Sequence, residues 1–124
     1  NIRDMDIEQL RRYCLQKNKV TEEFPFDQDT LVFKVLGKMF ALFPLVKWEK
    51  GEGSVNLKCD PEYALELRET YHSIVGGFHS NKKHWNTIYI HKGELQPKLV
   101  CEFIDHSYDL VVKGMTKKMR QELD

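Results

Sequence analysis

Alternating apolar and polar positions predict β-strands in three parts of the chain. The stretch at 30–43 contains two apolar runs around Gly37-Lys38, a pattern typical of a β-hairpin. A glycine-containing turn follows, and the next alternating stretch lies at 54–59. The most regular stretch lies at 84–90, after the pair Gly76-Gly77. The sequence therefore predicts a hairpin and two further strands.

Apolar positions spaced three or four residues apart predict helices between and after these strands. The first helix has Asp6 in position to cap it and Gln9 in the capping-box position. The second opens on Asp60-Pro61, a capping residue followed by proline at the first helical position. We expect helices at residues 6–17, 61–72 and 97–113, and a short one from residue 116 onward.

The resulting order of elements is α-β-β-β-α-β-α-α. Sequential antiparallel strands with helices grouped between them predict an α+β fold, specifically a two-layer α/β sandwich with an antiparallel sheet. We expect residues 1–124 to form a single domain, with residues 1–4 as a disordered end or a remnant of cloning. An antiparallel sheet of this kind can leave one face without helices.

Strand alternation assigns side chains to the two faces of the sheet. Leu31, Phe33 and Val35 should point toward the helices, as should Val55, Leu57 and Ile88. The uncovered face should then carry a mixed set of basic, amide and apolar side chains: Lys34, Phe40, Leu42, Asn56, Lys58, Trp85 and Tyr89. This set is too apolar for plain solvent exposure, so we expect a partner, a second subunit or the loop at 46–53 to cover it.

Charge is balanced overall, with 19 Lys and Arg against 19 Asp and Glu in 124 residues. A protein that binds nucleic acid mainly through phosphates is usually more basic, so any basic surface here must be local. The segment 70–93 contains no Asp or Glu but includes Lys82, Lys83, Lys92 and four of the five histidines. A second basic run without acids lies at 113–120.

The stretch HSNKKHWN at 79–86 concentrates the candidate binding chemistry. Lysines can pair with phosphates, the side chains of Asn81 and Asn86 can contact phosphates or base edges, and Trp85 can stack on a base. A purely structural role fits equally well. An asparagine in a turn commonly bonds the backbone, and a tryptophan at the start of a strand commonly packs.

Other motifs indicate neither catalysis nor a metal site. Asp105, His106 and Ser107 are consecutive on a helix, so their side chains project about 100° apart and cannot act together as a triad. The histidines lack helical metal-ligand spacing and have no carboxylate among them. We expect the aromatic segment Phe24-Pro25-Phe26 to plug the end of the sandwich, rather than to form the wall of a groove.

Three cysteines at positions 14, 59 and 101 have no paired spacing, which suits a reducing cytosol. No apolar run approaches the roughly 20 residues that span a bilayer. We therefore expect a cytoplasmic protein with free thiols that does not enter the membrane.

Four blocks of the sequence carry a family resemblance: EEFPFDQDTLVFKVLGKMFAL, VNLKCDPEYALELRE, NKKHWNTI and DHSYDLVV. Together they closely resemble the MmcQ/YjbR family of small bacterial proteins, over about residues 7–123. The resemblance implies a two-layer α/β fold related to secretion-chaperone-like folds, and a DNA-binding function. It implies no cofactor and no catalytic residue, and it places a functional loop at Asn81, Lys82, Lys83, His84 and Trp85.

These observations predict a non-enzymatic binding protein that contacts DNA through that loop. Lys58 and Lys34 are expected to be secondary phosphate contacts. The alternative is a protein-interaction module, in which the uncovered sheet face takes a peptide or a second copy of the chain.

Overall fold

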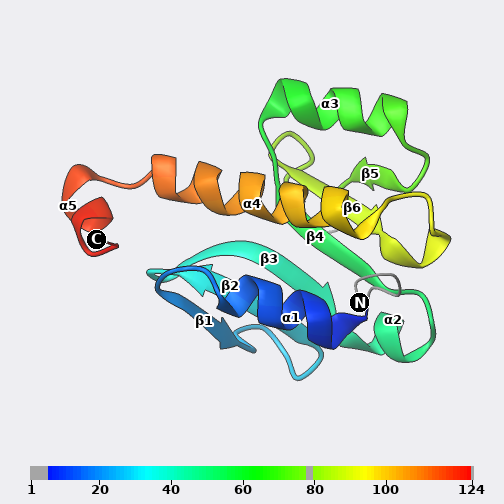
Figure 1. Cartoon of the computed structure of the whole chain (residues 1–124), viewed down its shortest axis with the longest axis horizontal. Helices are drawn as coiled ribbons and strands as arrows, with labels where there is room; N and C mark the ends of the chain where they lie inside the picture. The colour runs from blue at the N-terminus through cyan, green and yellow to red at the C-terminus, as the bar shows by residue number, and fades with distance from the viewer. Residues whose placement is uncertain (1–5, 78–79, 124) are drawn as a thin grey trace.

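A six-stranded antiparallel sheet forms one layer of the protein in the computed structural model, which describes residues 6–77 and 80–123 (Figure 1). The strand order across the sheet is β1-β2-β3-β4-β6-β5. In chain order the strands are β1 (Val20–Glu23), β2 (Thr30–Val35), β3 (Lys38–Pro44), β4 (Ser54–Lys58), β5 (Ile74–Gly76) and β6 (Trp85–Tyr89).

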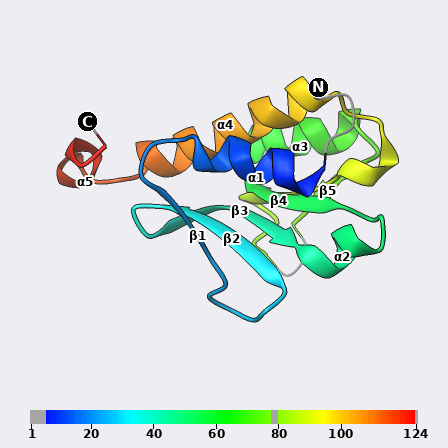
Figure 2. The same cartoon turned by 60° about the horizontal axis from the view of Figure 1, so that its bottom comes forward.

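The three longest helices form the second layer and lie on one side of the sheet, whereas the other side carries none of them (Figure 2). They are α1 (Ile7–Leu15), α3 (Pro61–Thr70) and α4 (Pro97–Lys113). The short helix α2 (Leu45–Glu49) follows β3 at the end of the sheet, and α5 (Lys117–Gln121) and the 3₁₀ turn η1 (Ile90–Lys92) complete the chain. The predicted α+β class is thus confirmed. The structure adds β1, β5 and α2, and α2 occupies part of the loop at 46–53, which was one of three candidates to cover the uncovered sheet face. Residues 1–4 lie outside the described residues.

Local capping explains where the main helices begin. Asp6 accepts a hydrogen bond from the Gln9 backbone N–H, and the Gln9 side chain accepts one from the Asp6 N–H, which completes the predicted capping box. Asp60 likewise accepts a hydrogen bond from the Tyr63 N–H at the start of α3. Thr116 caps α5 in the same way. These ends are therefore fixed by short-range interactions within the sequence.

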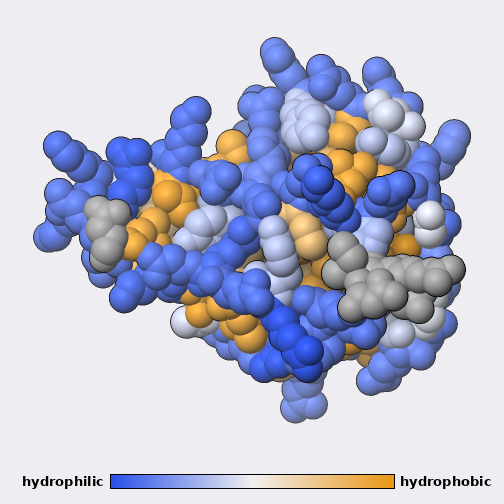
Figure 3. All heavy atoms as spheres, in the orientation of Figure 1, coloured by the Kyte–Doolittle hydropathy of each residue, from blue (hydrophilic) through white to orange (hydrophobic). Residues whose placement is uncertain are grey.

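The core lies between the sheet and α1, α3 and α4. Phe33 lies near its centre, with its ring 5.5 Å from that of Phe43 and 6.5 Å from that of Phe40. The predicted inward side chains of β2, β4 and β6 are all buried there. Outside this core, the surface of the helical layer is mainly hydrophilic, with hydrophobic side chains visible between the polar ones (Figure 3).

Phe40 corrects the predicted face assignment. Alternation placed it on the uncovered face, but it is fully buried, and its ring makes an edge contact with Tyr108 of α4 at 5.4 Å. The reason is a β-bulge: Phe33 pairs with Ala41 but Lys34 pairs with Met39, so Phe40 is an extra residue in β3. Because β3 is apolar at successive positions, strict alternation could not detect this residue.

Three consecutive residues of α4 connect the helix to three different parts of the chain. Asp105 accepts hydrogen bonds from Tyr13 and Lys17 at the end of α1. The Nε2 atom of His106 accepts a hydrogen bond from the Asp60 N–H at 3.3 Å. Ser107 faces the sheet. Their divergent directions confirm that these side chains form no catalytic triad.

The Ser107 hydroxyl bridges β3 and β4. It donates to the Phe40 carbonyl at 2.6 Å and accepts from the Lys58 N–H at 2.9 Å. The direct pairing of β3 with β4 is limited to Ala41 with Leu57 and Leu42 with Asn56. One buried side chain thus satisfies two backbone groups beside the bulge, where the direct pairing of the two strands has ended.

All three cysteines are free, in agreement with the expected thiols. Burial raises the pKa of Cys14 to about 12 and that of Cys59 to about 11, so both are protonated at neutral pH. Among the described residues, no helix combines the length and hydrophobicity needed to cross a bilayer.

Replacing Ser107 with alanine should destabilise the protein by about 2–4 kcal/mol, because two buried backbone groups lose their partner. Urea unfolding measures this change. Ser54→Ala is the matched control: Ser54 is also buried, but its hydroxyl bonds no other described residue, so this variant should change stability by less than about 0.5 kcal/mol. Equal, small effects of the two substitutions would contradict the bridging role.

Candidate functional site

The sheet face without helices, here called the open face, is organised in cross-strand rows. Lys34 pairs with Met39, and Lys58 pairs with Trp85, near one end of the strands. The middle row consists of Val32, Leu42, Asn56, Thr87 and Val75. Thr30 pairs with Pro44, and Ser54 with Tyr89, near the other end. The predicted outward positions are therefore confirmed, except for Phe40.

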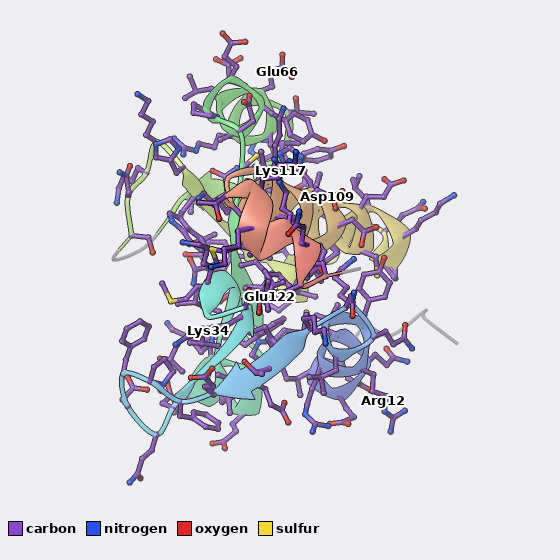
Figure 4. The ribbon with its side chains drawn as sticks, turned by 90° about the vertical axis from the view of Figure 1, so that its left-hand side faces the viewer. Arg12, Lys34, Glu66, Asp109, Lys117 and Glu122 are labelled. Atoms are coloured by element: carbon purple, nitrogen blue, oxygen red, sulfur yellow. The ribbon has the colours of Figure 1, made fainter. Side chains whose placement is uncertain are left out.

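The basic end of the open face combines Lys58 and Trp85 on adjacent strands. Both side chains are partly exposed, and they are direct cross-strand neighbours. Lys34 lies on the same face of β2, away from α1 (Figure 4). Its ammonium is 3.3 Å from the Glu23 carboxylate, an ion pair that offsets its charge. Lys58 is therefore better placed than Lys34 to meet an anionic ligand.

A tight loop leads into Trp85. The Asn81 side-chain oxygen accepts a hydrogen bond from the Lys83 N–H at 2.9 Å, and the Asn81 carbonyl accepts from the N–H groups of His84 and Trp85. The structural interpretation of Asn81 is thus confirmed: its side-chain oxygen shapes the turn. The loop closes where the Gly77 N–H bonds the Trp85 carbonyl at 2.8 Å.

Lys82 and Lys83 differ in their surroundings, although both are exposed. The Lys82 ammonium donates to the Gly77 carbonyl at 3.1 Å, so this lysine also holds the loop together. The Lys83 side chain makes no hydrogen bond or ion pair within the part of the chain that the structure describes, and its charge is available to solvent. Partly buried His84 accepts a hydrogen bond at its carbonyl from the Cys59 N–H, at 2.7 Å.

Arg68 of α3 anchors this loop from the opposite side of the sheet. Its Nε donates to the buried Asn86 side chain at 2.7 Å, and its guanidinium also donates to the Lys82 carbonyl. Neither Arg68 nor this role of Asn86 was predicted. Arg68 lies four residues after inward-facing Ala64, so helical spacing provided a signal. The pairing itself joins distant residues and has no signature in the sequence.

The other end of the open face is hollowed into a groove of about 480 Å³. The loop at 24–29 and Ser80 flank it, and Figure 4 shows that loop extending beyond the sheet. Its lining combines aromatic, aliphatic, amide and hydroxyl groups with one carboxylate and one ammonium: Phe26, Asp27, Thr30, Leu42, Pro44, Lys47, Ser54, Asn56, Ser80, Thr87 and Tyr89. A concave site of this size and mixed lining is typical of ligand pockets.

The aromatic segment before β2 was predicted to be buried, and this prediction was wrong. Phe24 is 49% exposed and Phe26 is 62% exposed. Asp27 explains the conformation, because its carboxylate accepts hydrogen bonds from the N–H groups of Asp29 and Thr30 and so turns the chain into β2. The same bonds hold the pKa of Asp27 below its usual range. Phe26 is left as a wall of the groove.

Metal ligation finds no support in the described geometry. Within residues 6–77 and 80–123, no group of three or more His, Cys, Asp or Glu side chains could hold a metal ion. His79, one of the histidines considered in the sequence, lies outside the described residues.

Comparison with known proteins identifies the family. The family model described as YjbR matches residues 15–110. The chain belongs to the YjbR family. It is 36% identical over 111 residues to uncharacterized protein YbdF of Escherichia coli O157:H7, with 90% of this chain and 88% of YbdF covered. It is 30% identical to uncharacterized protein YjbR of Escherichia coli K12, with 96% and 98% of the two chains covered.

Solved structures of similar proteins share this fold. The crystal structure of Deinococcus radiodurans protein DR2400 is similar with a TM-score of 0.84 and 41% identity, over 95% of this chain and 87% of that one. A Pseudomonas syringae protein is similar with a TM-score of 0.70 and 26% identity, over 86% and 98%. The YjbR fold expected from the four sequence blocks is thus confirmed.

Gly77 should tolerate no side chain, because the loop closes directly against it. A Cβ at this position would lie 2.8 Å from the Trp85 Cβ and 3.0 Å from the Trp85 carbonyl oxygen. Gly77→Ala should therefore cost about 1–3 kcal/mol in urea unfolding. At neighbouring Gly76, a Cβ would meet only the flexible Lys82 side chain, at 3.2 Å, so Gly76→Ala should cost less. A reversed order would show that the loop closes differently.

Proposed function

We propose that this YjbR-family protein is a non-enzymatic binding protein that holds a strand of DNA across its open face. The observation that carries the proposal is the pairing of Lys58 with Trp85, next to the loop of Lys82 and Lys83. This arrangement puts positive charge and an aromatic ring on one uncovered surface. Phosphates would meet the lysines, and a base would stack on the tryptophan.

Local charge makes this proposal compatible with a net charge of zero. Among the described residues, Lys58, Lys82 and Lys83 take part in no ion pair, whereas Lys17 and Lys34 do. The segment 70–93 contributes no carboxylate, although Glu62 of α3 lines the same small pocket as Lys82 and Lys83. Because exposed charges are screened within roughly 10 Å at 0.1 M salt, acids elsewhere on the surface weaken this patch little.

The shape of the open face favours a single strand over a duplex. The bases of a duplex are already stacked on one another, so Trp85 could stack only on a base that is unpaired. The flanking loop at 24–29 and Ser80 further make this surface concave rather than flat. We therefore expect single-stranded DNA to bind more tightly than duplex DNA of the same length.

Protein interaction is the second candidate, and the exposed Phe24 and Phe26 favour it. Phe26 lines the same groove as Leu42 and Pro44, and such apolar surface is common at interfaces between proteins. A peptide or a second copy of the chain would use the same surface. Salt separates the two functions, because DNA binding weakens steeply as salt rises and an apolar contact does not.

Reversing the charge of Lys82 and Lys83 together, by Lys82→Glu and Lys83→Glu, should abolish binding to single-stranded DNA at 50 mM salt. For a single strand, log affinity falls with log salt, and each lost phosphate contact makes this slope shallower by about 0.7. Any residual affinity measured by fluorescence anisotropy should therefore depend less steeply on salt, by about 1.4 in that slope.

The matched control is Lys117→Glu with Lys118→Glu on α5, which changes the net charge equally and also replaces two exposed lysines. This variant should retain most of the affinity. Thermal melting should confirm that both variants fold, with at most a small loss of stability in the first variant, where the bond from Lys82 to the Gly77 carbonyl is removed. Equal loss in both variants would show a nonspecific charge effect, and unchanged affinity in the first would remove this loop from the interface.

A further inference from the structure

The groove on the open face has a polar floor built by neighbouring strands. Thr87 of β6 donates a hydrogen bond to the side-chain oxygen of Asn56 on β4, which fixes the orientation of that amide. Ser54, two residues before Asn56 on the same face, is only 4% exposed. Its hydroxyl bonds no other described residue. Because no buried side-chain oxygen or nitrogen of the described residues lacks a partner, this hydroxyl is reached by solvent from the groove, where a ligand can bond it.

Aromatic side chains line the groove from two sides. Phe26 belongs to the loop before β2 and is 62% exposed. Tyr89 belongs to β6 at the other side, and the Lys92 ammonium lies 5.1 Å from the centre of its ring. Aromatic walls stack on flat rings, whereas amide and hydroxyl groups pair with ring nitrogens and carbonyls. This combination is the chemistry that recognises a nucleobase.

Charge indicates which part of a nucleotide would enter. The Asp27 carboxylate, whose pKa is lowered, and the Lys47 ammonium both line the groove, so the two charges offset each other and leave no excess positive charge to attract a phosphate. Lys58 lies toward the other end of the open face, beside Trp85, while Lys82 and Lys83 belong to the loop that leads into Trp85 and border α3. Trp85 and Tyr89 are four residues apart on one strand, about 13 Å at the rise of a β-strand. The phosphates would therefore stay near the lysines while a base reaches the groove.

We propose that the groove takes one unstacked base of a single-stranded nucleic acid. This inference rests on the proposed function, because Lys58, Lys82 and Lys83 hold the strand whose base enters. A base within a duplex is stacked and paired, so it must be extruded before it can enter a pocket. The groove thus makes the protein selective for unpaired bases, which the lysines alone would not.

The test compares a single-stranded oligonucleotide with a strand of equal length whose central nucleotides lack bases. Wild-type protein should bind the normal strand at least tenfold more tightly. Phe26→Ser and Asn56→Leu should each lower affinity for the normal strand toward that for the abasic strand, and should leave affinity for the abasic strand unchanged. Phe24→Ser is the matched control, since Phe24 is exposed in the same loop but does not line the groove.

The outcomes separate the groove from the proposed function. Equal affinity for both strands, with lysine-dependent binding retained, would overturn the proposal that the groove takes a base. It would leave the proposed function unaffected. If no strand binds even at low salt, the proposed function fails. An NMR titration with free nucleosides then tests whether the groove binds a base. Shifts of the Ser54, Asn56 and Thr87 amides at millimolar nucleoside would support the groove, and their absence would overturn it.

Discussion

The hydrogen bonds of the Ser107 hydroxyl hold the central part of this fold together. This one side chain donates to the Phe40 carbonyl and accepts from the Lys58 N–H, beside the bulge where the direct pairing of β3 with β4 has ended. Three of the four blocks that carry the family resemblance meet at this point. Because Ser107 belongs to α4, the same contact also fixes the longest helix to one face of the sheet.

Placing the helices on one face leaves the other face free. The bulge turns Phe40 into the core. Lys58, whose backbone N–H bonds the Ser107 hydroxyl, directs its side chain to the open face beside Trp85. Arg68 holds the lysine loop from the helical side through Asn86. The contacts that build the core therefore also determine which charged and aromatic side chains the open face presents.

Local signals predicted much of this structure. The hairpin, the capping box at Asp6 and the start of α3 follow from neighbouring residues, and alternation placed Lys58 and Trp85 correctly. The edge strands β1 and β5 are only four and three residues long, too short to show a pattern. The bulge at Phe40, the Ser107 bridge and the groove depend on residues that are distant in sequence, so no local rule reveals them. Exposure of Phe26 likewise opposes the usual burial of aromatic residues.

The central claim is that the open face is the binding surface, and NMR shift mapping tests it most directly. Backbone amide shifts of the labelled protein would be followed as a short single-stranded oligonucleotide is added at low salt. The account predicts changes along β4 and β6 and in the loop at 80–84, with α1, α3 and α4 largely unaffected. Changes confined to the helical layer or to α5 would contradict it.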